Sequence, residues 1–336
     1  MYDIEEAMIK VERISKTFDG GKTAVAEVSF EVAAGETLIL LGTSGCGKTT
    51  TLRMINRLIE PTTGAVFVDG RNTRDIPLEE LRRGMGYVLQ DNGLFPHFTV
   101  AENVAIVPAL LGWEKERIRK RTRELLEKLH LPPGEYFNAY PDNLSGGQQQ
   151  RVGLARALAA NQPVLLLDEP FGALDPITRS HIQKDFKTLD EIRRKTVIMV
   201  THDVSEAIEL GDRICLMDEG RVAQWGTPTE LLLQPASDFV RAFFEAGRLE
   251  LELRVVKLKH IWPLLPQPEL LPEGVLPAFN EDLRMSSSVW ETMQTINAAP
   301  GGRVRVHWEG HTRPITGADL MNAFTRYKDE LLKNNH

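Results

Sequence analysis

A glycine-rich loop that ends in a lysine and two threonines lies early in the chain, in "LGTSGCGKTT" at residues 41–50. Glycine lacks Cβ, so Gly42, Gly45 and Gly47 can adopt positive φ angles and turn several backbone N–H groups toward one point. The preceding "TLILL" predicts a buried strand, and "KTTTLRMINRLI" predicts a helix whose positive dipole end faces the loop. The stretch is therefore expected to bind an anion such as phosphate.

The spacing Gly42-x4-Gly47-Lys48-Thr49 fits the Walker A phosphate loop. In such a loop the lysine reaches the β and γ phosphates of a nucleotide, and the Thr49 hydroxyl coordinates Mg²⁺. A glycine turn without a ligand is the alternative, and the flanking strand and helix argue against it. The predicted nucleotide-binding residues of this loop are Gly42, Thr43, Ser44, Gly45, Cys46, Gly47, Lys48, Thr49 and Thr50.

Two consecutive acids follow the apolar run in "VLLLDEP" at residues 164–170. Adjacent side chains of a strand point to opposite faces, so Asp168 and Glu169 cannot share one task. Asp168 can hold Mg²⁺, and Glu169 can orient and deprotonate an attacking water. A solvated acidic turn before Pro170 is the alternative. In a chain with a Walker A loop, the segment is better interpreted as a Walker B strand.

A second glycine turn opens the strong helical pattern of "NLSGGQQQRVGLARALAA" at residues 143–160. Ser145 is suited to cap this helix, whose N-terminus is also open to an anion. "LSGGQ" resembles the signature motif of the ATP-binding cassette (ABC) ATPases, and the resemblance extends from about Met8 to Phe244. It implies a homodimer with ATP between the chains, in which the signature turn of one chain faces the phosphate loop of the other through Ser145, Gly146, Gly147 and Gln148.

The ABC resemblance assigns roles to four further residues. Gln90 in "YVLQD" matches the glutamine that senses Mg²⁺ and the attacking water, and Asp175 matches an aspartate at the dimer seam. His202 in "VTHD" matches the histidine that touches the γ phosphate. Phe18 occupies the place of the aromatic residue that stacks on adenine, with burial in the core as the alternative. Asp203 is better explained as the N-cap of the next helix.

The composition limits the classes of function. With a formal net charge of −7 and a pI near 5.7, the chain is not expected to bind nucleic acid, which usually requires a basic excess. The two cysteines, Cys46 and Cys215, cannot form a disulfide framework, so a reducing cytoplasm is expected. The acidic start "MYDIEEAMIK" is unlike a signal peptide, and the apolar runs are too short to span a bilayer.

Short apolar runs alternate with helical patterns, which predicts an α/β domain with a largely parallel sheet. With the resemblance, the expected fold is a P-loop NTPase of the ABC type at residues 1–246, with a helical subdomain at about 91–162. After Phe243 the pattern is expected to dissolve, because five prolines after Ile261 forbid a long helix or a central strand. We therefore place a boundary near Gly247.

Residues 247–336 are predicted to form a small α+β accessory module. From Ser286 the patterns indicate helix, strand, strand and helix, and from about Val275 the region resembles a single cystathionine-β-synthase (CBS) repeat. Thr316 and Asp319 have the spacing that holds a ribose in such repeats. The same pair is also a good helix cap, which needs no ligand.

Three phrases, "LFPHFTVAENV", "MINRLIEPTTG" and "VPALLGW", resemble bacterial importers of osmoprotectants such as glycine betaine, carnitine or choline. This resemblance implies ATP and Mg²⁺ as cofactors, membrane permease subunits and, indirectly, a solute-binding protein as partners, and a location at the cytoplasmic face of the membrane. An importer of another small solute remains open. A soluble ABC protein of repair or translation is disfavoured, because the chain has one set of motifs and no sustained heptads.

Overall fold

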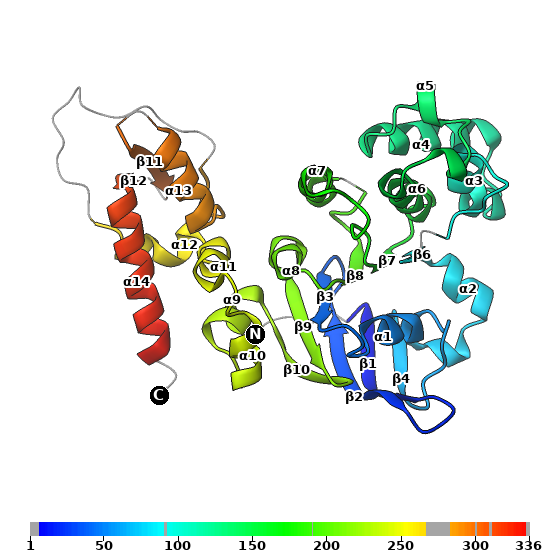
Figure 1. Cartoon of the computed structure of the whole chain (residues 1–336), viewed down its shortest axis with the longest axis horizontal. Helices are drawn as coiled ribbons and strands as arrows, with labels where there is room; N and C mark the ends of the chain where they lie inside the picture. The colour runs from blue at the N-terminus through cyan, green and yellow to red at the C-terminus, as the bar shows by residue number, and fades with distance from the viewer. Residues whose placement is uncertain are drawn as a thin grey trace. The chain divides into compact units, whose positions relative to one another are not determined.

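The computed structural model describes residues 7–90, 93–189, 191–266, 283–299, 301–308 and 311–333 (Figure 1). The chain divides into two compact units, Met1–Trp225 and Gly226–His336. The predicted functional boundary near Gly247 stays a prediction, and the expected start of the CBS-like repeat at about residue 275 lies outside the described residues. Within the described ranges no helix is both long and apolar enough to cross a bilayer.

A six-stranded sheet with the order β10-β9-β3-β8-β7-β6 lies at the centre of the first unit. Its strands are β3 (Thr37–Gly42), β6 (Met85–Val88), β7 (Val164–Asp168), β8 (Thr196–Val200), β9 (Arg213–Asp218) and β10 (Arg221–Gly226). The pairs of β3 with β8 and β9, and of β7 with β6 and β8, are parallel. Every residue of β7 and β8 is buried, as expected of parallel strands covered on both faces. The predicted α/β class is confirmed.

The register of three strands brings their carboxyl ends to one edge of the sheet, where β7 and β8 end level at Asp168 and Val200 and β3 runs two residues further, to Gly42. Val200 of β8 pairs with Leu40 of β3 on one side and with Asp168 of β7 on the other. The loops that follow these three strands therefore leave the sheet at the same edge, which is where ligands bind in open α/β sheets.

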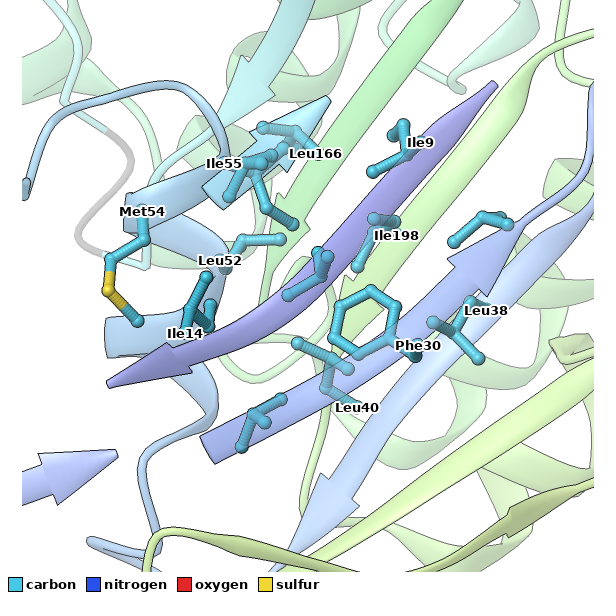
Figure 2. Packing of buried hydrophobic residues seen from close by; sticks show 14 of the residues in the cluster. Ile9, Ile14, Phe30, Leu38, Leu40, Leu52, Met54, Ile55, Leu166 and Ile198 are labelled. Atoms are coloured by element: carbon cyan, nitrogen blue, oxygen red, sulfur yellow. The ribbon is translucent and has the colours of Figure 1, made fainter. Parts of the chain in front are cut away.

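A second, antiparallel sheet lies beside the first and has the order β2-β1-β4-β5. It consists of β1 (Ile9–Thr17), β2 (Thr23–Val32), β4 (Thr63–Val68) and β5 (Arg71–Asn72). Helix α1 (Lys48–Ile55) contributes Leu52, Met54 and Ile55 to one core cluster with residues of both sheets, among them Phe30 and Leu166 (Figure 2). The helix that follows the phosphate loop is thus anchored by two sheets.

The predicted helical subdomain is present, and the described residues 93–162 contain no strand. Helices α3, α4 and α6 pack on one another in the upper right of Figure 1 through buried residues such as Val104, Leu125 and Leu154. The subdomain contains α3 (Val100–Leu110), α4 (Lys115–Lys128), α5 (Pro133–Tyr136), η2 (Pro141–Asn143) and α6 (Gly146–Ala159). The remaining helices of the unit are η1 (Thr73–Asp75), α2 (Leu78–Arg83), α7 (Pro176–Thr188) and α8 (Val204–Leu210).

The second unit ends with the predicted order of helix, strand, strand and helix. Its elements are α9 (Pro228–Leu233), α10 (Asp238–Phe243), α11 (Arg248–Val255), α12 (Leu258–Ile261), η3 (Trp262–Leu264), α13 (Val289–Ala298), β11 (Arg303–Trp308), β12 (His311–Thr316) and α14 (Gly317–Lys333). The core of this last part includes Val289, Ile296, Val304, Val306, Leu320 and Phe324, each at most 2% exposed. Met293 beside them is half-buried.

Helix α11 corrects the expectation that regular structure dissolves after Phe243. In the run "LELEL" apolar and acidic residues alternate with a period of two, which predicts a strand rather than a helix. The helix is supported by ion pairs four residues apart, Arg248 Nε to Glu252 Oε1 at 2.9 Å and Arg254 Nη2 to Glu250 Oε1 at 2.7 Å. Its buried face packs on α9 and α13. Tertiary packing and ion pairs therefore outweigh the ambiguous local pattern.

The Thr316 and Asp319 pair forms a reciprocal cap at the start of α14. The Asp319 N–H donates to Thr316 Oγ1 at 3.2 Å, and the Thr316 N–H donates to Asp319 Oδ2 at 3.0 Å. The Thr316 hydroxyl also donates to Asp319 Oδ2 at 2.6 Å. Capping thus accounts for the spacing of the pair without a ribose.

Candidate nucleotide-binding site

The loop between β3 and α1 takes the shape that its glycines allow. Gly42, Gly45 and Gly47 have φ angles of 149°, 81° and 104°. A Cβ at Gly42 would lie 2.2 Å from the Met217 carbonyl oxygen of β9, and a Cβ at Gly47 would lie 2.5 Å from the Ala24 carbonyl oxygen of β2. The loop is therefore pressed between two strands, and only glycine fits at either position.

Lys48 starts α1 with its ammonium group folded back into this loop. Nζ donates to the carbonyl oxygens of Gly42 at 2.9 Å and Thr43 at 2.8 Å, and the residue is 6% exposed. Cys46, in the same loop, is buried, and its Sγ lies 3.8 Å from the Lys48 ammonium. Burial raises the pKa of its thiol. A positive charge and the N-terminal end of a helix thus meet at one concave loop, which suits phosphate.

Asp168 is fully buried at the end of β7, where it meets α1. The Thr49 hydroxyl donates to Asp168 Oδ1 at 2.8 Å. The other oxygen, Oδ2, has no hydrogen-bond donor and lies 3.7 Å from Arg53 Nη2. Burial raises the pKa of the Asp168 carboxyl, while the Thr49 hydroxyl and Arg53 oppose that rise. A buried carboxylate oxygen that accepts no hydrogen bond suits a cation.

Glu169 follows Asp168 in the left-handed region with φ 48°, which is uncommon for a residue other than glycine. Its Oε1 lies 3.4 Å from Nδ1 of His202, which follows the end of β8 by two residues. The level ends of β7 and β8 therefore bring the two predicted catalytic side chains, Glu169 and His202, together. Glu169 lies beyond the end of β7, so the strand alternation on which the different tasks of the two acids were predicted does not extend to it.

A pocket of about 860 Å³ lies over these residues. It brings together predicted residues from five separate segments: Phe18, Ser44, Gly45, Gly47, Lys48, Thr49, Thr50, Gln90, Glu169 and His202. Gly42, Thr43, Cys46 and Asp168 lie behind this lining, in contact with it through Lys48 and Thr49. Phe18 is 41% exposed, so the alternative of burial in the core is wrong.

The signature turn does not line this pocket within one chain. Ser145 caps α6, with Gln148 N–H donating to its Oγ at 3.3 Å and its own N–H donating to Gln148 Oε1 at 2.7 Å. The predicted capping role of Ser145 is therefore confirmed. Asp175 caps α7 through the Thr178 N–H at 3.1 Å, and that interaction lowers the pKa of its carboxyl. Asp203 caps α8 in the same way, as predicted.

Six lining residues were not expected from the sequence: Lys22, Thr23, Ala24, Arg53, Glu219 and Gly220. Arg53 could have been predicted from the sequence, because it follows Thr49 by four residues and so lies on the same face of the helix. Glu219 and Gly220 belong to the turn between β9 and β10, and the Gly220 N–H donates to the Cys46 carbonyl at 3.1 Å. Their place beside the loop depends on the pairing of β9 with β3, which leaves no local signal.

Comparisons with known proteins agree with this geometry. A family model described as "ABC transporter" matches residues 25–172. A glycine betaine/carnitine/choline transport ATP-binding protein of Bacillus subtilis is 52% identical over 242 residues, which are 72% of this chain and 63% of that protein. A glycine betaine uptake system ATP-binding protein of Escherichia coli is 48% identical over 254 residues, 76% of this chain and 81% of the relative.

A solved dimeric ATP-binding cassette in a post-hydrolysis state with ADP and Pi superposes with a TM-score of 0.61 at 38% identity. It covers 66% of this chain and 98% of its own. The matched part of this chain spans less than two thirds of the length of the Bacillus subtilis relative. Because the Escherichia coli relative is matched over most of its length at nearly half identity, the chain belongs to the ABC transporter family and has the fold of its ATP-binding cassettes.

Proposed function

We propose that the chain binds ATP with Mg²⁺ and hydrolyses ATP to drive an importer of a quaternary amine osmoprotectant such as glycine betaine, carnitine or choline. The observation that carries the chemistry is the shared carboxyl edge of three parallel strands, which gathers Lys48, Asp168, Glu169 and His202 at one site. The names of the relatives support the class of solute.

The residues at the end of β7 fit Mg²⁺. The Thr49 hydroxyl and the Asp168 carboxylate offer hard oxygen donors, and Asp168 Oδ2 has no donor of its own. Gln90 lines the same pocket and can complete the metal environment. When bound, Mg²⁺ neutralises charge on the β and γ phosphate oxygens.

The chain's own residues divide the remaining work. The loop N–H groups and Lys48 bind and orient the phosphates, and Phe18 offers an exposed ring for the adenine. Glu169 accepts a proton from the water that attacks the γ phosphorus, and the P–O bond to ADP breaks as phosphate forms. His202, 3.4 Å from Glu169, orients the carboxylate and touches the γ phosphate.

The partners follow from the position of the signature turn outside the pocket. In our proposal Ser145, Gly146, Gly147, Gln148 and Asp175 meet the ATP of a second copy of the chain in a homodimer. The dimeric cassette with ADP and Pi supports this arrangement. The dimer would bind permease subunits at the cytoplasmic face of the membrane, and a solute-binding protein would deliver the solute.

The module from about Gly247 is proposed to regulate or dimerise the transporter without taking part in hydrolysis. The residues that line the nucleotide pocket all lie between Phe18 and Gly220. The C-terminal helices and the β11–β12 hairpin have their own buried core. A response to ionic strength or to an adenine nucleotide is the expected kind of regulation.

Glu169→Gln tests the assigned chemistry in the assembled transporter. In liposomes with permease and binding-protein subunits, glycine betaine should stimulate ATP hydrolysis by the wild type. The variant should retain ATP binding and lose hydrolysis by about 10²-fold to 10⁴-fold, the usual range for a general base. Lys48→Ala should instead weaken ATP binding, measured by titration. Near-normal turnover of the Glu169→Gln complex would rule out the assigned role of Glu169.

Ser145→Arg tests the composite site. The added bulk and charge should block closure of the dimer while each chain still binds ATP at its own phosphate loop. Light scattering with ATP in the Glu169→Gln background, which favours the ATP-bound dimer, gives the readout. A dimer that forms equally well with and without Ser145→Arg would contradict the proposed seam.

Phe324→Ala tests the division of labour between the two regions. Loss of this buried ring should cost the module about 3–5 kcal/mol of stability, measured by denaturant unfolding. Basal ATPase activity of the full chain should persist while its response to salt changes. Thr325→Ala, at an exposed position of the same helix, is the control. Loss of basal hydrolysis in a chain whose first unit stays folded would show that the module is needed for catalysis.

A further inference from the structure

The side chain of Gln150 joins the signature helix to the loop that carries Glu169. Gln150 lies in the second turn of α6 and is 3% exposed. Its Nε2 donates to the Glu169 carbonyl oxygen at 3.2 Å, and its Oε1 accepts from the Ala173 N–H at 3.0 Å. The two contacts fix the orientation of the amide. If the amide were flipped, its NH₂ group would face the Ala173 N–H and its oxygen would face the Glu169 carbonyl oxygen, and neither pair can form a hydrogen bond.

The backbone of Glu169 needs such support. Its φ of 48° lies in a region that non-glycine residues adopt only where the surroundings hold them. The Glu169 N–H donates to the Val200 carbonyl at 3.0 Å, and its carbonyl accepts from the Gly172 N–H at 3.2 Å. Gln150 adds a second donor to that carbonyl from a different part of the fold.

The direction of the Glu169 carboxylate follows from this backbone. A change of φ or ψ at Glu169 would swing its side chain away from His202, whose Nδ1 is 3.4 Å from Glu169 Oε1. Gln150 also fixes the other end of the turn at Ala173, two residues before Asp175. One buried amide therefore holds both ends of the segment between the proposed base and the proposed dimer seam.

We propose that Gln150 is a positioning residue for ATP hydrolysis, which holds the Glu169 backbone so that its carboxylate faces the attacking water. This inference rests on the proposed function, since it assigns a task only if Glu169 is the base. Ser145 precedes Gln150 by five residues on the same helix, so the signature turn and the base are linked through one rigid element. A displacement of α6 at the dimer seam is thereby transmitted to Glu169.

Two substitutions separate the contacts. Gln150→Met keeps the length of the side chain and removes both hydrogen bonds. Gln150→Glu keeps an acceptor for the Ala173 N–H and removes the donor to the Glu169 carbonyl. Because a small misplacement of a catalytic group can cost about 10²-fold in rate, we expect each variant to lower kcat by about 10-fold to 10²-fold. The KM and Kd for ATP should stay within about 2-fold, since the phosphate-binding loop is untouched.

Gln183→Met is the matched control. Gln183 is a half-buried glutamine of α7 whose Nε2 donates to Glu206 Oε1 at 2.9 Å, and neither residue lines the nucleotide pocket. Its loss should reduce stability in a similar way and leave kcat within about 2-fold. A fall in kcat equal to that of Gln150→Met would show a general effect of losing a glutamine contact and would overturn the proposal.

A double-mutant cycle with Glu169→Gln identifies the route of the effect. If Gln150 acts through Glu169, then Gln150→Met in the Glu169→Gln background should lower the single-turnover rate by no more than about 2-fold further. A multiplicative loss in the double variant would overturn the proposal. So would a Gln150→Met chain that hydrolyses ATP like the wild type, or one that loses ATP binding together with hydrolysis.

The outcome for the wild-type chain separates this inference from the proposed function. A purified full chain that binds and hydrolyses ATP, and that loses hydrolysis on Glu169→Gln, supports the function whatever Gln150→Met does. A wild-type chain without ATP binding would overturn both. The expected pattern is a wild type that is active, a Gln150→Met chain that binds ATP and hydrolyses it slowly, and a Gln183→Met chain that resembles the wild type.

Discussion

The pairing register of β3, β8 and β7 is the constraint on which the rest of the site depends. Val200 lies opposite both Leu40 and Asp168, so β7 and β8 end level and β3 ends two residues further along the same edge. The phosphate loop lies more than 100 residues before the two acids and the strand-end histidine, and all of them meet because their strands share one edge. A slip of one residue in this register would also turn the buried side chains of the strands to the wrong face.

The site combines a rigidly held loop and helix with a buried carboxylate oxygen that has no hydrogen-bond donor. Helix α1 is held by a core cluster drawn from two sheets, and its loop is pressed between β2 and β9. Within this frame Lys48 is satisfied by two loop carbonyls, whereas Asp168 Oδ2 has no hydrogen-bond donor. A buried charged group without hydrogen-bond partners destabilises a structural core. Such a group is expected where a charged ligand supplies the missing partner.

The sequence predicts those parts of the site whose cause is local. The glycines, Lys48 and Thr49 follow from one loop, and the apolar runs before Asp168 and His202 predict buried strands. The antiparallel sheet and the turn at Glu219 were not predicted, because both depend on pairing between distant segments. Helix α11 was missed since its leucines alternate like those of a strand, and Gln150 was missed because its partners are backbone atoms about 20 residues away.

A calorimetric titration of the full chain with ATP, with and without Mg²⁺, in the wild type and in Asp168→Asn tests the proposed Mg²⁺ site at the end of β7. The asparagine keeps an acceptor for the Thr49 hydroxyl and removes the charge at the end of β7. Mg²⁺ should strengthen ATP binding by the wild type, and this enhancement should be lost in the variant while binding without Mg²⁺ is retained. An undiminished Mg²⁺ enhancement in Asp168→Asn would contradict the Mg²⁺ site proposed at the ends of these strands.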